Sequence, residues 1–467
     1  MTQHPSETTI PPRNAVPFAS VAMRGLFALP PVLRRPRWVL GLLAVLLAAG
    51  ALGSLPAWNA SLRKLLKSVT YADVSRQWFC SLYVRHGVNP FGAANDALER
   101  TYGPVQGPDR IRLKDVHIYS ANTTVYDDRT PGLLPGLPPP EAGYPPSSLL
   151  ICMGLFGYLP LHAVVGYWLA VNVLCFLLLI AFWAWPTVAA APKRTVGSLL
   201  FCAGVLAVWP TTRLVFAHGQ FTAFSLLAAL AGLHFRTVRP WLAAALFSLA
   251  LVKPALVLLF LMVPFLERNW RLFFGIAVLH GLATLAVAWM VRTPPWLLID
   301  QWMNICRYFL QGSFTFQEIY NALGWENTPI QTALTLAFFL YSLWACWIAR
   351  RARPWLLLGY LCFANLLWTY HERHDFTLLA IPLALGLLEW LAAPGNWETH
   401  VRWAAWVALF AAIGIGLGDV AYTNSRPYSH LLRWLGRGGI AAVFFWLNVE
   451  LWRTFFQNRR ARRPDAA

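Results

Sequence analysis

Charged residues are scarce in this chain. Only 12% of its 467 residues are Asp, Glu, Lys or Arg, whereas 57% are hydrophobic. Soluble domains carry about 25% charged and roughly 45–50% apolar residues. A soluble chain of this length needs a charged surface over several domains. The composition therefore excludes a soluble enzyme, a soluble nucleic-acid-binding protein and a secreted disulfide scaffold.

Acidic residues and paired cysteines are also few. The 20 Asp and Glu face 38 Lys and Arg, which gives a net charge of +18. In a membrane protein such an excess is explained by basic cytoplasmic loops before any nucleic-acid partner. The seven cysteines have neither CxxC nor metal-ligand spacing, so no zinc site or redox pair is predicted. No tandem repeat and no Ser/Gly linker indicates a separate soluble domain.

Long apolar runs are what the sequence has instead. Runs near 20 residues recur from Trp38 to Phe456, and about 20 apolar residues cross the hydrocarbon core of a bilayer as a helix. The fold class predicted is an all-α polytopic membrane protein with about 12 transmembrane helices. They are expected near 38–58, 161–185, 195–215, 221–235, 240–252, 254–266, 272–291, 329–349, 354–370, 376–393, 401–421 and 438–456.

Basic clusters at alternate helix boundaries predict the orientation, because cytoplasmic loops are enriched in Lys and Arg. The clusters are Arg24/Arg34/Arg35/Arg37, Lys193/Arg194, Arg236/Arg239, Arg268/Arg271, Arg350/Arg351/Arg353 and Arg459/Arg460/Arg462/Arg463. Both termini are then cytoplasmic. We expect a cytoplasmic N-terminal segment (1–37), a transmembrane domain (38–456) and a basic cytoplasmic tail (457–467).

Two long loops fall on the outer face, 59–146 and 292–328, and long loops often carry function. The stretch Ser61 to Val84 is amphipathic and is expected to lie as an interfacial helix. The segment 147–158 is too short to span and is predicted to be a re-entrant or surface helix. Residues 240–266 carry Arg at both ends, so they are predicted to form a hairpin with Lys253 near the outer face.

Asp73 opens the first outer loop, just beyond a membrane helix. One interpretation is a solvated carboxylate that pairs with Arg76 one turn later. The other is a general base in a cleft at membrane level. Both remain open on this feature alone.

A denser group of ionisable residues, 370–375, lies between two apolar helices on the outer side. His371, His374 and Asp375 fall close to one helical face, with Glu372 and Arg373 between them. A polar turn, a substrate site and a transition-metal site all fit these residue types.

Cations and hydrogen-bond donors also gather at the neighbouring outer turns. Arg213, His218 and Gln220 lie at one turn, and Lys253 lies at the tip of the expected hairpin. Singly, each is more often a snorkelling or capping residue than a ligand. Together with Arg373 they suit a phosphate whose lipid tail lies in the membrane.

These motifs have a recognisable order. Asp73, followed by Tyr83 through Gly87-Val-Asn-Pro-Phe91, resembles the opening of glycosyltransferase family 87, which holds membrane mannosyltransferases of the GT-C class. Tyr144-Pro-Pro146, the Leu159-Pro160 break with Trp168 and Asn172, Gly219-Gln220, Lys253-Pro254 and the 371–375 cluster follow in the family's order. The resemblance covers roughly residues 70 to 390.

The resemblance implies a GT-C-like bundle that uses a polyprenyl-phosphate sugar, commonly mannose, as donor. Asp73 matches the family's proposed catalytic base, whereas Phe221 stands where the family usually has Asn. The residues expected to hold the donor phosphate are Lys253, Arg373, His371, His374 and Arg213. The residues expected to contact substrate are Tyr144, Gln220, His218, Asp375 and Glu372.

Elementary chemistry agrees with this expectation. A polyprenyl phosphate is a good leaving group, so one carboxylate base and cations on the phosphate suffice. A single attack inverts the anomeric centre, and a lipid or glycan hydroxyl is the expected acceptor. No cofactor is expected, although a divalent metal stays open. The resemblance implies the inner membrane of a bacterium, with the site facing the periplasm. The alternative function is a multi-pass transporter or flippase of lipid-linked sugars.

Overall fold

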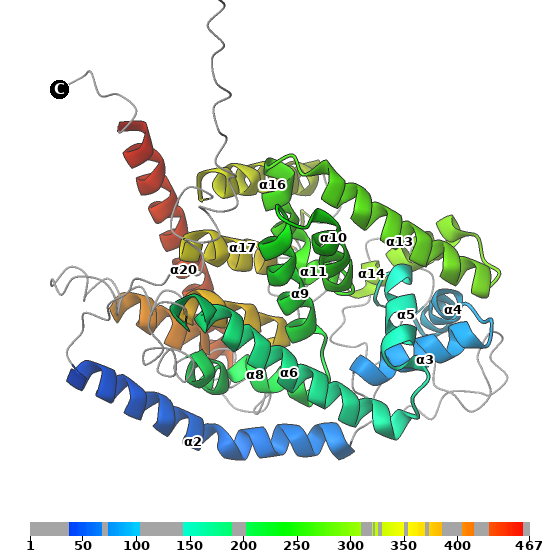
Figure 1. Ribbon diagram of the computed structural model, residues 1–467, viewed down its shortest axis with the longest axis horizontal. Helices are drawn as coiled ribbons and strands as arrows, with labels where there is room; N and C mark the ends of the chain where they lie inside the picture. The colour runs from blue at the N-terminus through cyan, green and yellow to red at the C-terminus, as the bar shows by residue number, and fades with distance from the viewer. Residues whose placement is uncertain are drawn as a thin grey trace, which may run out of the picture.

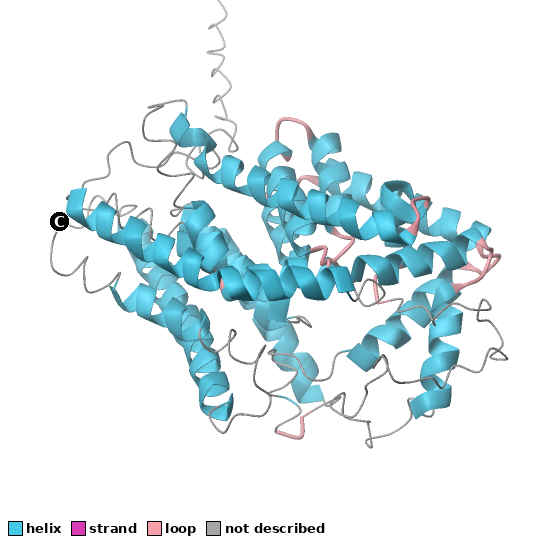
Figure 2. Ribbon diagram, turned by 90° about the horizontal axis from the view of Figure 1, so that it is seen from below, coloured by secondary structure: helices cyan, strands magenta, loops and turns pink. Residues whose placement is uncertain are grey.

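The computed structural model describes residues 37–67, 73–102, 143–188, 202–309, 320, 323–325, 329–349, 354–368, 373–384, 404–414 and 429–460. Within these ranges the chain is helical and has no strand (Figure 2), which confirms the all-α expectation. The expected N-terminal segment before residue 37, residues 103–142 of the first outer loop and the tail after residue 460 lie outside the described residues.

The first half of the described chain contains α2 (Arg37–Lys67), α3 (Asp73–Arg85), α4 (Pro90–Tyr102), α5 (Pro146–Cys152), the π-helix η2 (Met153–Gly157), α6 (Leu161–Val188), α8 (Pro210–Ala217), α9 (Thr222–Phe235) and α10 (Pro240–Ala250). The second half contains α11 (Pro254–Val257), the 3₁₀-helix η3 (Leu258–Leu261), α12 (Met262–Leu266), α13 (Trp270–Met290), α14 (Pro295–Phe309), α16 (Pro329–Ala349), α17 (Pro354–Trp368), the 3₁₀-helix η4 (Arg373–Leu379) and α20 (Ser429–Arg460).

Proline marks the start of many of these helices. Pro146, Pro210, Pro240 and Pro254 are each the first helical residue of their element. The first turn of a helix has no intrahelical use for its N–H groups, so proline costs nothing there and its fixed φ favours the helix. Some expected boundaries agree with the structure, as at 329–349 for α16. Others differ, since α2 continues to Lys67, α20 begins at Ser429, and the span expected at 376–393 begins inside η4.

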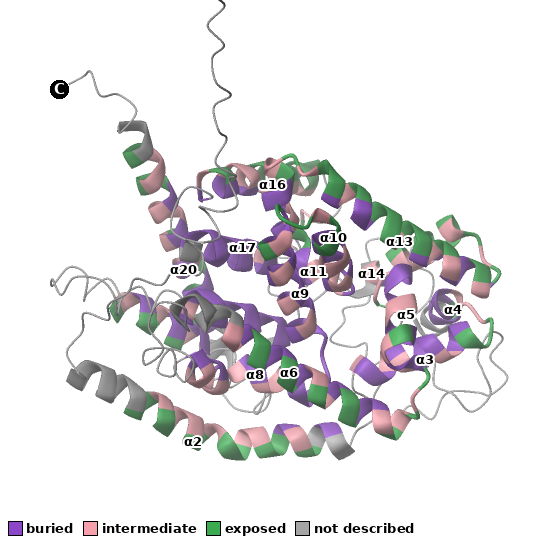
Figure 3. Cartoon of the chain, viewed as in Figure 1, coloured by how far each residue is buried: buried purple, intermediate pink, exposed green. Residues whose placement is uncertain are grey.

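The helices enclose a buried centre. In Figure 1, α2 runs along one long edge and α13 along the opposite one, with α9, α10 and α11 between them. Figure 3 shows that burial is concentrated in this middle region, while α2, α6 and α13 carry exposed outer faces. Those faces are apolar, as at Leu177, Phe274 and Leu282. A broad exposed apolar surface suits contact with lipid.

Four described helices are long and apolar enough to cross a membrane. They lie at Val45–Arg63 in α2, at Leu161–Ala181 in α6, in α13 and in α16. α8 and α9 together pass the same test as a broken span, bent by 110° at the residues between them. The chain is thus a multi-pass membrane protein in character, and the expected total of about 12 spans stays a prediction.

The segment 240–266 turns back on itself. Near its tip, Lys253 contacts Gln220 and Thr222 at the start of α9. At its far end, Glu267 contacts Arg236 just after α9, with 2.7 Å between Nε and Oε2. α10 leaves from that same end and packs along α9. Residues 240–266 therefore form a hairpin beside α9, with Lys253 at its turn.

The stretch Ser61 to Val84, predicted to lie in the membrane interface, contains parts of two helices, and its depth in a membrane stays a prediction. α2 continues to Lys67, and α3 starts separately at Asp73. Eight of the 13 residues of α3 are buried, because it packs against α5, α6 and η2. Ser75 and Ser81 are among these buried residues, so α3 packs inside the described part of the protein.

Candidate active site

The turn between α8 and α9 carries Gln220. Gly219 has a φ of +58°, a left-handed conformation that glycine adopts without strain, and it ends α8 in the manner of a glycine C-cap. The backbone N–H of Gln220 then donates to the carbonyl of Val215 at 2.9 Å. The indole N–H of Trp168 donates to the carbonyl of Gln220 at 3.3 Å. This turn is therefore held by hydrogen bonds from two helices.

Asp73 lies against that turn at the start of α3. Its backbone N–H donates to the carbonyl of His218 at 2.8 Å, and its Oδ2 accepts a short hydrogen bond from the Gln220 side-chain amide. Arg76 follows one turn later, with 3.6 Å between its Nη1 and Oδ1 of Asp73. The Asp73 side chain keeps 18% of its surface exposed. Both interpretations of Asp73 from the sequence thus find a physical counterpart.

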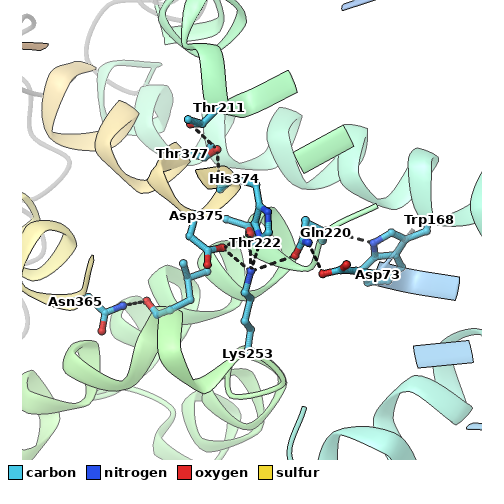
Figure 4. A network of polar contacts seen from close by, with 11 residues as sticks. Asp73, Trp168, Thr211, Gln220, Thr222, Lys253, Asn365, His374, Asp375 and Thr377 are labelled. Carbon is cyan, nitrogen blue, oxygen red and sulfur yellow. Dashed lines mark hydrogen bonds and ion pairs between the residues drawn. The ribbon is translucent and has the colours of Figure 1, made fainter. Parts of the chain in front are cut away.

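Lys253 lies on the other side of Gln220, in the break between α10 and α11. Its Nζ is 2.5 Å from Oδ1 of Asp375 and 2.9 Å from Nε2 of His374. It also donates to Oε1 of Gln220 at 3.1 Å and to Oγ1 of Thr222 at 3.3 Å. Figure 4 shows these side chains converging on the ammonium group.

The carboxylate that pairs with Lys253 comes from η4 and is buried. The Asp375 side chain is only 2% exposed, and its Oδ1 also accepts from Oγ1 of Thr222 at 2.8 Å. η4 is fixed to α8, because Thr377 meets Thr211 at 3.1 Å between hydroxyl oxygens. Burying a carboxylate is costly unless it is paired and hydrogen-bonded. Both conditions are met here.

An apolar cluster backs the polar network. Phe221, directly after Gln220, is fully buried against Trp168, with ring centroids 4.4 Å apart. The rings of Phe156 and Tyr144 also pack against Phe221, with centroids 6.2 Å and 5.4 Å from that of Phe221. Phe221 thus has a packing role where the resemblance would have placed an amide. The network lies between this cluster and the larger core.

The structure brings most of the expected site residues together. Asp73, Gln220, Lys253, His374 and Asp375 form one connected network, spread over four parts of the chain (Figure 4).

The remaining residues expected at the site either lie near this network or fall outside the described residues. The His218 ring lies 6.2 Å from that of His374, and Tyr144 reaches the site through its contact with Phe221. Arg213 is half-buried on α8. His371 and Glu372 lie outside the described residues, as does the side chain of Arg373.

The comparisons with known proteins give the family. Residues 143–370 match the model of glycosyltransferase family 87. This match supports the family resemblance found in the sequence motifs. No curated protein and no solved structure matches it. The family implies a glycosyltransferase of the membrane type, in agreement with the apolar helices of this chain.

The family match contains part of the site. Gln220 and Lys253 lie inside residues 143–370, whereas Asp73, His374 and Asp375 lie outside. The glycosyltransferase therefore draws its network from both the matched region and the segments on either side of it. Asp73 is connected to the matched region by its contacts with Gln220 and His218.

Thr222 is the network residue that the sequence reasoning missed. Its hydroxyl accepts from Lys253 and donates to Asp375. Its position two residues after Gln220 was the only available signal, and a threonine at a helix start is common for capping reasons. Within the described ranges, no group of three or more His, Cys, Asp or Glu side chains could hold a metal ion. His371 and Glu372 are not covered by that finding.

Proposed function

We propose that this glycosyltransferase moves a sugar from a polyprenyl-phosphate donor to a hydroxyl of a lipid or glycan acceptor. Mannose or a related hexose or pentose is the proposed sugar. Asp73 acts as general base, takes the proton of the attacking hydroxyl, and the anomeric centre inverts. The donor phosphate departs with the bonding electrons, so no general acid is required.

The accessibility of Asp73 is the observation that carries this proposal. The network has two carboxylates, and they differ in environment. Asp375 is 2% exposed and its charge is compensated by Lys253 at 2.5 Å, so it cannot reach a substrate hydroxyl. Asp73 is 18% exposed and lies at the edge of the network. A general base must come within hydrogen-bond reach of the proton it abstracts, and Asp73 meets that condition better.

The donor phosphate needs cations at the depth where its lipid tail is anchored. We propose Arg213, Arg373 and His371 for this role. Lys253 and His374 were expected to share it. However, Nζ of Lys253 lies 2.9 Å from Nε2 of the buried His374, and three further acceptors surround the same ammonium group.

The proposed setting is the inner membrane of a bacterium, with both termini cytoplasmic and Asp73 on the outer side. The support is the alternation of arginine clusters along the sequence. Cysteine-accessibility labelling tests it. Labelling of cysteines placed beside Arg459–Arg463 from the outer side would overturn this topology.

Transfer assays test the function itself. The purified protein in lipid nanodiscs is given a panel of polyprenyl-phosphate sugars and a lipid acceptor, with and without chelator. We expect product with an inverted anomeric centre, and a loss of about 10²–10⁴ in turnover for Asp73→Asn. The matched control is Asp96→Asn, which changes an exposed carboxylate on α4 in the same expected loop.

Two outcomes would oppose the proposal. Near-normal turnover of the Asp73→Asn variant would leave Asp73 as a structural partner of Arg76. Movement of a lipid-linked sugar across the bilayer with its glycosidic bond intact would favour the flippase alternative.

A further inference from the structure

The ammonium group of Lys253 is fully used inside the protein. It has three protons, and four acceptor atoms lie between 2.5 and 3.3 Å from Nζ. Its side chain is 11% exposed. A phosphate could bind Lys253 only by displacing one of these partners, so the geometry points to a role within the network.

Lys253 fixes which way the Gln220 amide faces. An ammonium group only donates hydrogen bonds, so the amide atom facing it must be the oxygen. The amide nitrogen is then directed at Asp73 and donates to its Oδ2. The reversed amide would place NH₂ against the ammonium and oxygen against the carboxylate, which are two repulsive contacts. The cation therefore sets the direction of an amide that otherwise has two nearly equivalent orientations.

The main chain of the same turn holds Asp73 from its other end. The carbonyl of His218 accepts the Asp73 N–H at 2.8 Å, and Gly219 allows the turn that brings both contacts together. The buried Phe221 and Val252 stand next to Gln220 and Lys253 in the chain and belong to one apolar cluster. In such surroundings a hydrogen bond is electrostatically stronger than in water.

We propose that Gln220 is a positioning residue for Asp73 and that Lys253 acts through it by fixing the direction of its amide. The inference rests on the proposed function in one respect, that Asp73 is the base. It assigns Lys253 a role in turnover and removes it from the donor-phosphate site.

Turnover measurements separate the two roles of Lys253. Lys253→Met alone would leave the buried Asp375 carboxylate without the lysine that compensates its charge, so both are changed together as Lys253→Met with Asp375→Asn. Gln220→Leu removes the amide. A carboxylate misplaced by about 1 Å costs up to about 10²-fold in rate. We expect Lys253→Met/Asp375→Asn and Gln220→Leu each to lower kcat by about 10–10²-fold with the donor KM unchanged. The protein that carries all three substitutions should lose no more than the worse of these two variants, because both act through the same amide.

The matched control is Glu267→Gln, which perturbs the ion pair at the other end of the same hairpin. Its kcat should stay within about twofold of wild type, since it weakens the fold but lies away from Asp73. Unchanged kcat with a raised donor KM in the Lys253→Met/Asp375→Asn protein would make Lys253 a phosphate ligand and overturn the proposal. Multiplying effects in the combined protein would overturn it as well.

A second experiment tests the coupling without turnover. Melting temperatures in detergent are measured for Asp73→Asn, for Lys253→Met/Asp375→Asn, and for the protein that combines them. The same set is then measured in a Gln220→Leu background. We expect the shifts in melting temperature to be non-additive when Gln220 is present and additive when it is replaced. Additive shifts in both backgrounds, or equal non-additivity in both, would refute a coupling through the amide. If the wild type transfers no sugar, the proposed function fails, and this cycle still decides the coupling.

Discussion

Two glycines of α13 lead to opposite expectations for the same substitution. A Cβ built on Gly275 would lie 2.7 Å from the Cβ of Ala244 on α10 and 3.2 Å from the Trp241 ring. A Cβ on Gly281 would meet nothing within 4 Å. Carbon atoms pack at about 3.5–4.0 Å, so Gly275→Ala must push α10 away by roughly 0.8 Å. Ala244 is too short to yield by rotating its side chain.

The magnitude follows from two terms. Alanine gains about 1 kcal/mol over glycine in a helix interior, and both sites share this gain. At Gly275 the overpacking costs about 1–3 kcal/mol. We therefore expect Gly281→Ala to be as stable as wild type or more so. Gly275→Ala should lie about 1–3 kcal/mol below Gly281→Ala, and thus about 0–2 kcal/mol below wild type. Unfolding in one detergent, followed by a helical signal, measures the difference. Equal stability of the two variants would refute the close α10–α13 packing.

Two further predictions concern the ends of α9. Arg236→Met should destabilise the protein by about 3–5 kcal/mol, because it leaves the largely buried Glu267 without its bidentate partner. Adding Glu267→Met should recover most of this loss, and Arg239→Met, at an exposed residue of the same turn, is the control; a similar loss in that control would contradict the ion-pair argument. Gly219→Ala should cost about 1–2 kcal/mol, because its φ of +58° strains a residue with a side chain, and it should lower turnover by displacing Gln220. Unchanged melting temperature and turnover would show that the turn tolerates a Cβ.

The local parts of this fold could be predicted from the sequence. Proline at helix starts and apolar runs of spanning length act within one segment, so α16 was expected at 329–349 and is found there. The hairpin at 240–266 was predicted because Arg at both ends requires the chain to turn back. The structure reaches the same result through a different contact, the pairing of Arg236 with Glu267.

The contacts within the site could not be predicted in the same way. Asp73 and Gln220 are 147 positions apart, and Lys253 and Asp375 are 122 apart. Sequence position placed Lys253 at a membrane boundary, where a cation facing a lipid phosphate and a cation facing a buried carboxylate look alike. Only the tertiary packing of η4 against α8 and α9 distinguishes them. The amphipathic pattern of Ser61 to Val84 likewise did not indicate that α3 buries eight of its 13 residues, because packing on a second face of a helix leaves no clear signal in the sequence.

The position of the network follows from the physics of helices in a membrane. Asp73, Gln220 and Lys253 each lie where an α-helix begins or breaks, and Asp375 lies in a 3₁₀ segment. A helix interior satisfies its own backbone, whereas a break exposes polar groups that lipid cannot satisfy. The start of α3, the turns at Gln220 and Lys253, and the 3₁₀-helix η4 meet at the site. Their polar groups can hydrogen-bond to one another there, which gives a physical reason for these four segments to converge. Within this arrangement the ion pair of Lys253 and Asp375 is buried at the centre of the network. The Asp73 carboxylate lies at the edge of the network and stays partly exposed. A catalytic base needs that combination, because rigid support and access to substrate are otherwise in conflict. The residues that hold these helix breaks together thus include Gln220, which contacts Asp73 directly and which we propose positions it.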